Sequence, residues 1–145
     1  MFKKIFLFSV FCLLGFVVSG CSQDSGLSIV EVGGQEFKVE IPQTSAARAK
    51  GLAGRENLAE NKGMLFIFES AQFVSFWMKD MLIPLDFVWI REGEVVSVEK
   101  NIRPRDYQPP QTLTPAIKVD KVLELKAGTI DKYNIETGDK VNLLE

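Results

Sequence analysis

The sequence predicts a small, mainly β domain, a closed or partly open β-barrel with one or two short helices. Segments of strand length, either alternating or continuously apolar, recur from residue 28 to the end of the chain. Turn-forming glycine or proline residues separate most of these segments. Hydrophobic residues make up 46% of the 145 residues, which favours one folded domain over a disordered chain.

Residues 28–41 predict a β-hairpin. Gly33 and Gly34 lie near its centre, and glycine readily adopts the positive φ that a two-residue hairpin turn requires. Apolar and charged residues then alternate as far as Ile41, as in a strand with one buried face. Pro42 is expected to end this strand.

A short helix is expected next. Thr44 or Ser45 can cap its N-terminus, and an alanine-rich stretch leads toward Leu52. Gly51 and Gly54 weaken the helix, so we expect it to be only a few residues long.

The middle of the chain is rich in predicted strands. Residues 63–68 form a continuous apolar run, which predicts a strand covered on both faces. Segments 73–79 and 84–90 follow, and a turn at 91–94 leads into 95–99. Strands this close in sequence predict a meander.

The last third begins with a predicted loop. Residues 102–116 contain four prolines, and surface loops of this length are often functional. The chain then returns to a strand at 118–125, a turn of helix at about 129–134 and a final strand within 138–144.

The first 20 residues have the pattern of a secretory signal peptide, with two lysines, an apolar run and small residues before Cys21. This arrangement resembles the bacterial lipobox, which implies that Cys21 is lipidated and becomes the new N-terminus. An uncleaved transmembrane helix is the alternative. The apolar run from Ile5 to Val18 has only 14 residues, whereas about 20 are needed to cross a bilayer core.

The predicted organisation is therefore a signal peptide at 1–20, a short tether at 21–27 and a single β-barrel domain at 28–145. We expect a lipid-anchored protein of the cell envelope that faces the periplasm or the exterior. Membrane lipid is its expected partner through acylated Cys21, and an envelope protein or polysaccharide is a further candidate. The sequence leaves inner and outer membrane open.

Composition narrows the possible chemistry. Without the signal peptide, 15 basic residues face 19 acidic ones, so the net charge is about −4 and a nucleic-acid partner is not expected. The chain contains no histidine, and its cysteines are Cys12, within the signal, and Cys21. This excludes catalytic triads built on histidine and the usual zinc sites. We expect no metal and no cofactor, and assign no catalytic residue.

Several segments together resemble a bacterial and archaeal family, the domain of unknown function numbered 192. They are 63–68 (GMLFIF), 76–79 (FWMK), 83–86 (IPLD) and 122–125 (VLEL). The resemblance implies a small β-barrel and no settled biochemical activity. The chain departs from the family pattern at 80–81, where Asp-Met replaces the usual Asn-Thr.

The strand periodicity of 73–79 places Trp77 and Lys79 on one face. If both are exposed beside Asp86, they form a stacking platform with a charged rim, as in many binding sites. The alternative is that the neighbouring Phe76 and Met78 fill the core while Trp77 packs under a loop.

Asp86 lies between apolar residues, so its carboxylate either contacts a ligand or forms an ion pair with Arg55 or Lys79. Arg48 and Glu124 could likewise close a contact between a helix and a strand. The predicted contact surface comprises Trp77, Lys79, Asp86, Arg55, Arg103, Arg105 and Tyr107.

The leading functional hypothesis is a membrane-tethered, non-catalytic binding or accessory module. The alternative is a small envelope hydrolase that cleaves a saccharide or peptidoglycan-like polymer with paired carboxylates. Asp80 with Asp86, or Asp86 with Glu124, are the candidate pairs. A concave pocket beside Trp77, as opposed to a flat patch, is the feature that separates the two classes.

Overall fold

The computed structural model describes residues 26–144, which contain nearly all of the predicted domain. The predicted signal peptide and Cys21 lie outside the described residues. No helix within 26–144 has the length and apolar character needed to cross a bilayer.

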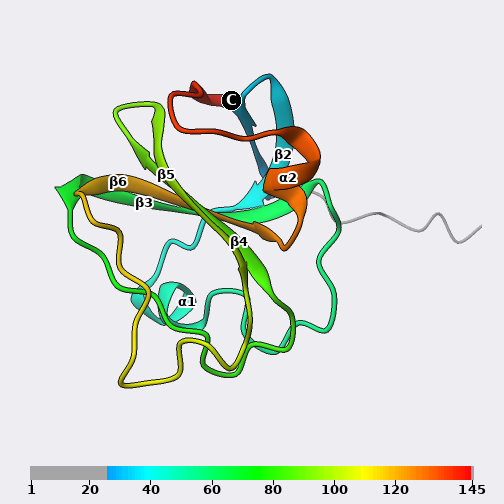
Figure 1. The fold of residues 1–145 in the computed structure, drawn as a ribbon, viewed down its shortest axis with the longest axis vertical. Helices are drawn as coiled ribbons and strands as arrows, with labels where there is room; N and C mark the ends of the chain where they lie inside the picture. The colour runs from blue at the N-terminus through cyan, green and yellow to red at the C-terminus, as the bar shows by residue number, and fades with distance from the viewer. Residues whose placement is uncertain (1–25, 145) are drawn as a thin grey trace, which may run out of the picture.

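The described chain forms one seven-stranded sheet and two short helices (Figure 1). The strand order across the sheet is β5-β4-β6-β3-β2-β1-β7, in which only β2 and β3 run parallel. In chain order the elements are β1 (Ser28–Val32), β2 (Gln35–Glu40), α1 (Ser45–Lys50), β3 (Lys62–Gln72), β4 (Leu85–Arg91), β5 (Glu94–Ile102), β6 (Val119–Lys126), α2 (Thr129–Tyr133) and β7 (Val141–Leu144).

The two outer strands, β5 and β7, approach each other over a short stretch but do not form a continuous ladder of hydrogen bonds. Val95 donates a backbone hydrogen bond to Asp139 at 2.9 Å, and Gly138 donates one to Val95 at 2.8 Å. One isolated bridge joins Glu94 and Lys140. The fold is therefore mainly β and partly open, as the sequence predicts.

The N-terminal hairpin and the first helix are confirmed. Gly33 and Gly34, with φ of 57° and 83°, form the hairpin turn between β1 and β2. The hydroxyl of Thr44 accepts a hydrogen bond from Ala47 N at 3.1 Å, so Thr44 is the N-cap of α1. Gly51 ends the helix with a positive φ of 51°.

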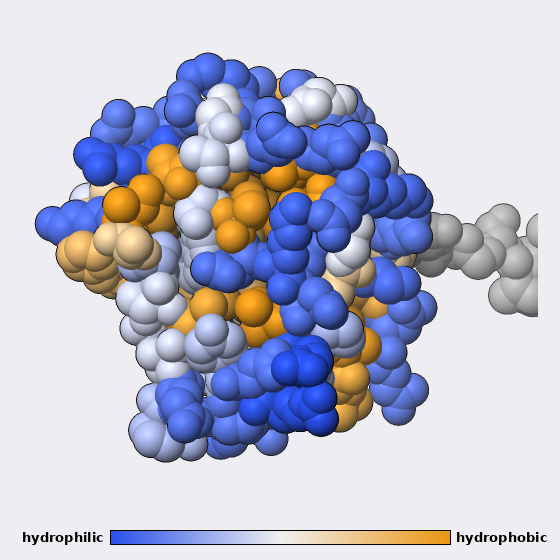
Figure 2. All heavy atoms as spheres, in the orientation of Figure 1, coloured by the Kyte–Doolittle hydropathy of each residue, from blue (hydrophilic) through white to orange (hydrophobic). Residues whose placement is uncertain are grey.

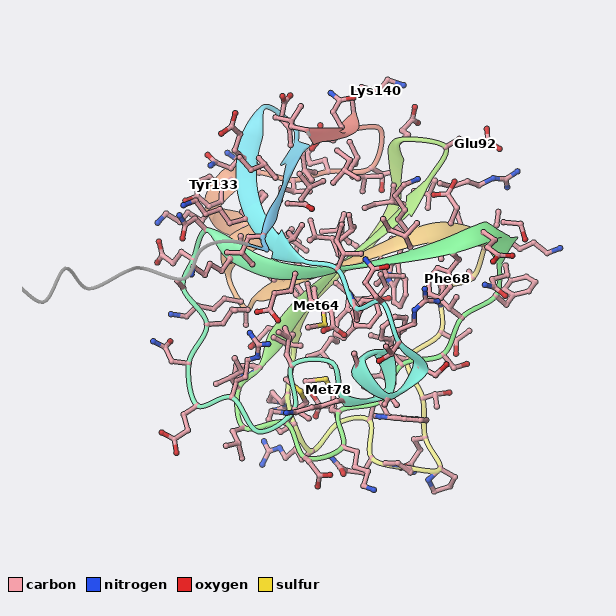
Figure 3. The ribbon with its side chains drawn as sticks, turned by 180° about the vertical axis from the view of Figure 1, so that it is seen from behind. Met64, Phe68, Met78, Glu92, Tyr133 and Lys140 are labelled. Atoms are coloured by element: carbon pink, nitrogen blue, oxygen red, sulfur yellow. The ribbon has the colours of Figure 1, made fainter. Side chains whose placement is uncertain are left out.

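Two hydrophobic cores lie on opposite faces of the central strands β3, β6 and β4. Successive residues of β6 alternate between them: Val122 belongs to one core, and Leu123 belongs to the other. The first core faces α1 and the loops around it, and the second is closed by α2 and by the β1, β2 and β7 strands (Figure 1). In Figure 3, Met64 and Met78 mark the first side, and Tyr133 and Lys140 mark the other. The prediction that 63–68 is covered on both faces is confirmed.

The close approach of β3 to β6 explains the glycine at the start of the apolar run. A Cβ atom at Gly63 would lie 2.5 Å from the carbonyl oxygen of Glu124 and 2.9 Å from Leu125 Cδ2. A side chain at this position would force the two strands apart, because real Cβ contacts are never so short.

The predicted meander is wrong in its first part. Residues 73–79 are not a strand, and β6 lies between β3 and β4 in the sheet. The segment makes one bridge, between Phe76 and Leu113 of the predicted loop, and Met78 N donates to Tyr107 O at 2.7 Å. Its side chains still alternate, with Met78 buried and Trp77 exposed. The pattern thus predicted burial correctly but not the pairing partner, because a period of two does not say which backbone groups pair.

Asp86 is not at the surface, which corrects its placement in the predicted contact surface. Its side chain is 1% exposed and accepts hydrogen bonds from Asn101 N at 2.8 Å and Ile130 N at 2.9 Å. It therefore ties β4 to the end of β5 and the start of α2. Neither predicted ion pair, with Arg55 or with Lys79, forms.

Asp86→Ala should lower the free energy of unfolding by about 2–5 kcal/mol, because two backbone N–H groups would lose their acceptor in a buried place. Urea unfolding monitored by circular dichroism measures this. Asp131→Ala is the matched control, since that exposed carboxylate pairs with Lys100 at the surface and should change stability little. Equal effects of the two substitutions would contradict the assigned role of Asp86.

Candidate functional site

A cavity of about 280 Å³ lies between α1 and the first-core face of the sheet. Residues from α1 and the turn after it, from β3, β4 and β6, and from the segment 73–81 line it. They are Arg48, Ala49, Lys50, Gly51, Leu52, Phe66, Phe68, Gln72, Phe73, Val74, Ser75, Phe76, Trp77, Lys79, Met81, Leu85 and Glu124. We call this space the α1 cavity.

Aromatic side chains form much of its wall. Phe66 and Phe76 meet edge to face with ring centroids 5.0 Å apart, and Phe76 also contacts Phe87 and Trp89 of the core. Phe73 and Trp77 are 61% and 45% exposed, which is unusual for such large apolar residues. The cavity is therefore a continuation of the first core that opens to solvent between exposed rings. In Figure 3, Phe68 lies near the far end of β3, on the side from which this wall is built.

The end of α1 lies directly over the floor of the cavity. A Cβ atom placed on Gly51 would be 3.7 Å from Phe66 Cζ and 3.9 Å from Glu124 Oε2. The helix itself contains no buried residue. It follows that α1 roofs the cavity and leaves it unfilled.

Glu124 is the buried acid of the cavity. It lies on the central strand β6, faces the first core opposite Met64 and Phe87, and is 6% exposed. Burial raises the pKa of its carboxyl to about 8, and the positive charge of Arg55 opposes this rise. Within 26–144, no hydrogen bond engages its side chain. At neutral pH this carboxyl is therefore largely protonated and can donate a hydrogen bond into the cavity.

Arg55 lies between two acids on the same face of the sheet. Its guanidinium binds Glu40 bidentately, with Nη1 to Oε1 at 2.6 Å and Nη2 to Oε2 at 2.7 Å. This pairing lowers the pKa of Glu40 and raises the pKa of Arg55. The register places Glu40 beside Met64, and Met64 beside Glu124. The guanidinium thus neutralises Glu40 by direct contact, whereas it acts on Glu124 only through the electrostatic effect of its charge.

Three cationic side chains line the cavity, namely Arg48, Lys50 and Lys79, and all three residues are exposed. None of them takes part in the ion pairs found between residues 26 and 144. Arg48 donates from Nε to the carbonyl oxygen of Pro42 at 3.3 Å, which leaves its charge without an acidic partner. The cavity entrance is therefore positively charged, and its floor carries a neutral acid.

In the structure, the residues of the predicted contact surface do not lie together. Trp77 and Lys79 border the α1 cavity, and Arg55 lies beside it with Glu40. The loop residues Arg103, Arg105 and Tyr107 line a second, more open hollow of about 640 Å³. There Arg103 already pairs with Asp106 at 3.0 Å.

Sequence reasoning considered Arg48 as a structural contact and Glu124 as a structural contact or as the partner of Asp86 in a carboxylate pair, and it did not single out Lys50, Phe68 or Phe73. One signal was available for Glu124, because it is the single acid within the apolar run 122–125 (VLEL) of a strand predicted to be core. Its neighbours across the sheet could not be read from that run. Within 26–144, no group of histidine, cysteine, aspartate and glutamate residues could hold a metal ion.

Glu124→Gln should change how stability depends on pH. The carboxyl has a pKa of about 8 when folded and an ordinary value of 4.5 when unfolded, so the folded state binds the extra proton between these values. The wild type should therefore lose a few kcal/mol of stability as pH rises from about 4.5 to 8, and the variant should lack this part of the decline. Urea unfolding at several pH values measures it.

Glu56→Gln, an exposed acid next to Arg55, is the control and should retain the wild-type profile. Arg55→Met should raise the pKa of Glu124 further, because the positive charge that lowers it is removed. Parallel pH profiles for the wild type and Glu124→Gln would show that the carboxyl is not protonated in the folded state.

Comparisons with known proteins identify the family. The model of DUF192, described as an Uncharacterized ACR, matches residues 28–143. A search of curated proteins found no match. The chain is similar to a solved structure from Sinorhizobium meliloti 1021, named as a candidate transcription regulator, with 28% identity and a TM-score of 0.73 over 81% of this chain and 93% of that one.

A second similar structure is a protein of unknown function from Novosphingobium aromaticivorans DSM 12444. It has 31% identity and a TM-score of 0.70, over 80% of this chain and 82% of that one. The resemblance seen in the sequence motifs is thereby confirmed. The chain belongs to the DUF192 family, for which no biochemical function is established.

Proposed function

We propose that this protein is a lipid-anchored binding module of the cell envelope that holds a small ligand in the α1 cavity. The observation that carries the proposal is the cavity itself. It combines apolar walls with a few convergent polar groups, which is the usual composition of small-molecule sites. Its volume of about 280 Å³ suits a small molecule or the end group of a larger one.

The envelope part of the proposal rests on the N-terminal sequence. Cys21 follows a signal-like segment and precedes the first strand, which begins at Ser28, by only a few residues. At about 3.3 Å per extended residue, such a tether reaches roughly 20 Å. The cavity would then work close to the membrane surface, within reach of lipids, envelope proteins or polysaccharide.

The sheet register argues against Asp86 with Glu124, one of the two carboxylate pairs of the hydrolase alternative. Asp86 pairs across the sheet with Leu125 and Glu124 pairs with Phe87, so the two carboxyl groups point to opposite faces. The lining of the α1 cavity holds Glu124 as its only carboxyl among the described residues. A concave pocket is present beside Trp77, but paired-carboxylate cleavage needs two acids in one site.

The name of the Sinorhizobium meliloti structure does not guide the proposal. Nucleic-acid binding relies on a strongly basic surface, and this chain has a net charge of −2 before any processing.

Cys21→Ser should abolish both acylation and membrane association, because the thiol that would carry the acyl chains is gone. Metabolic labelling with an alkyne fatty acid and fractionation of the host envelope measure the two effects. Cys12→Ser is the matched control and should remain labelled and membrane-bound. An unlabelled wild-type protein would refute the anchor.

Trp77→Ala combined with Lys79→Ala should remove ligand from the cavity and leave the fold intact, since both side chains are exposed at its border. Native mass spectrometry of protein purified from envelopes detects a retained small molecule. Leu82→Ala is the control, because this exposed leucine does not line the cavity. Unfolding of the double variant would mean that both residues are structural. If the wild-type protein carried no bound small molecule, the result would count against the proposal.

A further inference from the structure

The charge distribution around the α1 cavity differs from that of the chain as a whole. Acidic residues outnumber basic ones, 19 to 17, yet three cationic side chains without acidic partners border this one space. Most other basic residues between 26 and 144 are neutralised, for example Lys100 by Asp131 and Lys140 by Glu94. Three cations outside these ion pairs therefore lie together around the cavity.

We propose that the α1 cavity binds a small organic anion with a flat apolar body, and that it does so only while Glu124 is protonated. This inference rests on the proposed function and names the ligand class for the same site. The anionic group would lie among Arg48, Lys50 and Lys79, and the apolar body would lie against Phe66, Phe76 and Trp77 (all lining residues of the cavity).

Charge complementarity selects an anion over a cation. A positive ligand would meet three like charges at the entrance, and the single acid inside is neutral at pH 7. Like charges at short range repel and opposite charges attract, so the sign of the ligand charge matters for both approach and binding. Aromatic walls favour a flat body, because rings stack or meet edge to face at 4.5–7 Å.

The requirement for a proton follows from the position of Glu124. When protonated, this carboxyl is neutral and offers a hydrogen-bond donor to the ligand. When ionised, it places a negative charge in the same small space as the anion. Repulsion between two carboxylates in one site is the effect that keeps one of them protonated in other proteins.

Four cationic groups and one further acid lie near Glu124. Arg48 and Lys50 come from α1, Lys79 from the segment after β3, and Arg55 from the loop after α1. Glu40 stays ionised because Arg55 lowers its pKa. Between pH 6 and 9 the charge of the site therefore changes at Glu124.

The test uses three probes that share a phenyl ring and a three-carbon chain and differ in charge: 3-phenylpropionate, 3-phenylpropan-1-ol and 3-phenylpropylamine. Each is titrated calorimetrically into the mature acylated protein, which begins at Cys21, in lipid nanodiscs, with empty nanodiscs as the blank. The acid should bind at least about tenfold more tightly than the alcohol, and the amine more weakly than both.

Affinity for the acid should fall about tenfold between pH 7 and 9, because Glu124 loses its proton in this range. Glu124→Gln should still bind the acid and lose the pH dependence, since its amide is neutral and donates a hydrogen bond. Lys79→Gln should weaken the acid alone. Lys118→Gln is the matched control, an exposed lysine outside the cavity lining, and should change nothing.

The possible failures are distinguishable. Equal or tighter binding of the alcohol or amine would overturn the anion inference and leave the cavity as a binding site. Unchanged affinity for the acid between pH 7 and 9 would overturn the role of the Glu124 proton. If none of the three probes bound, both the anion inference and the proposed use of the cavity would be refuted for ligands with an aromatic body.

Discussion

Burial of both faces of β3, β6 and β4 is the constraint on which the rest of this structure depends. Because the sheet separates two cores, side chains in the middle of these strands are enclosed except where a core is incomplete. The face covered by α2 and the N-terminal hairpin is closed, whereas the face covered by α1 and two long loops is not. Figure 2 shows apolar surface only in broken patches between hydrophilic residues on the side that it presents.

The two buried acids meet this constraint in opposite ways. Asp86 remains compatible with burial because two backbone N–H groups, from β5 and α2, donate to its oxygens. Glu124 has no such donors among the described residues, so desolvation dominates and the proton stays bound. The first acid is a structural connection between three elements, and the second is available to a ligand. Their chemical difference arises from the backbone around them, since both are carboxylates on neighbouring strands.

The first core is open on the side of α1 because this helix covers the core without packing side chains into it. A six-residue helix with no buried side chain cannot fill the space over Phe66 and Glu124. Gly51 brings the chain close above them and leaves room below. The segment 73–81 contributes its exposed rings on the other side. Loosely covered apolar surface of this kind is costly unless something occupies it, which is the physical basis for regarding the cavity as a site.

Local sequence determined the strands, the turn and the caps of this protein, because each depends on residues that are neighbours in the chain. The hairpin follows from Gly33-Gly34, the start of α1 from Thr44, and the two-sided burial of β3 from its unbroken apolar run. The family, too, was recognisable from short motifs. Tertiary structure alone decided which strands pair beyond the hairpin and which acids share a face. Nothing within 73–79 shows that Phe76 pairs with Leu113, 37 residues further along the chain. Likewise, nothing within 122–125 shows that Glu124 lies under Gly51. Pairing and burial of this kind depend on long-range contacts, so the cavity and the charges around it emerge only when the sheet is assembled.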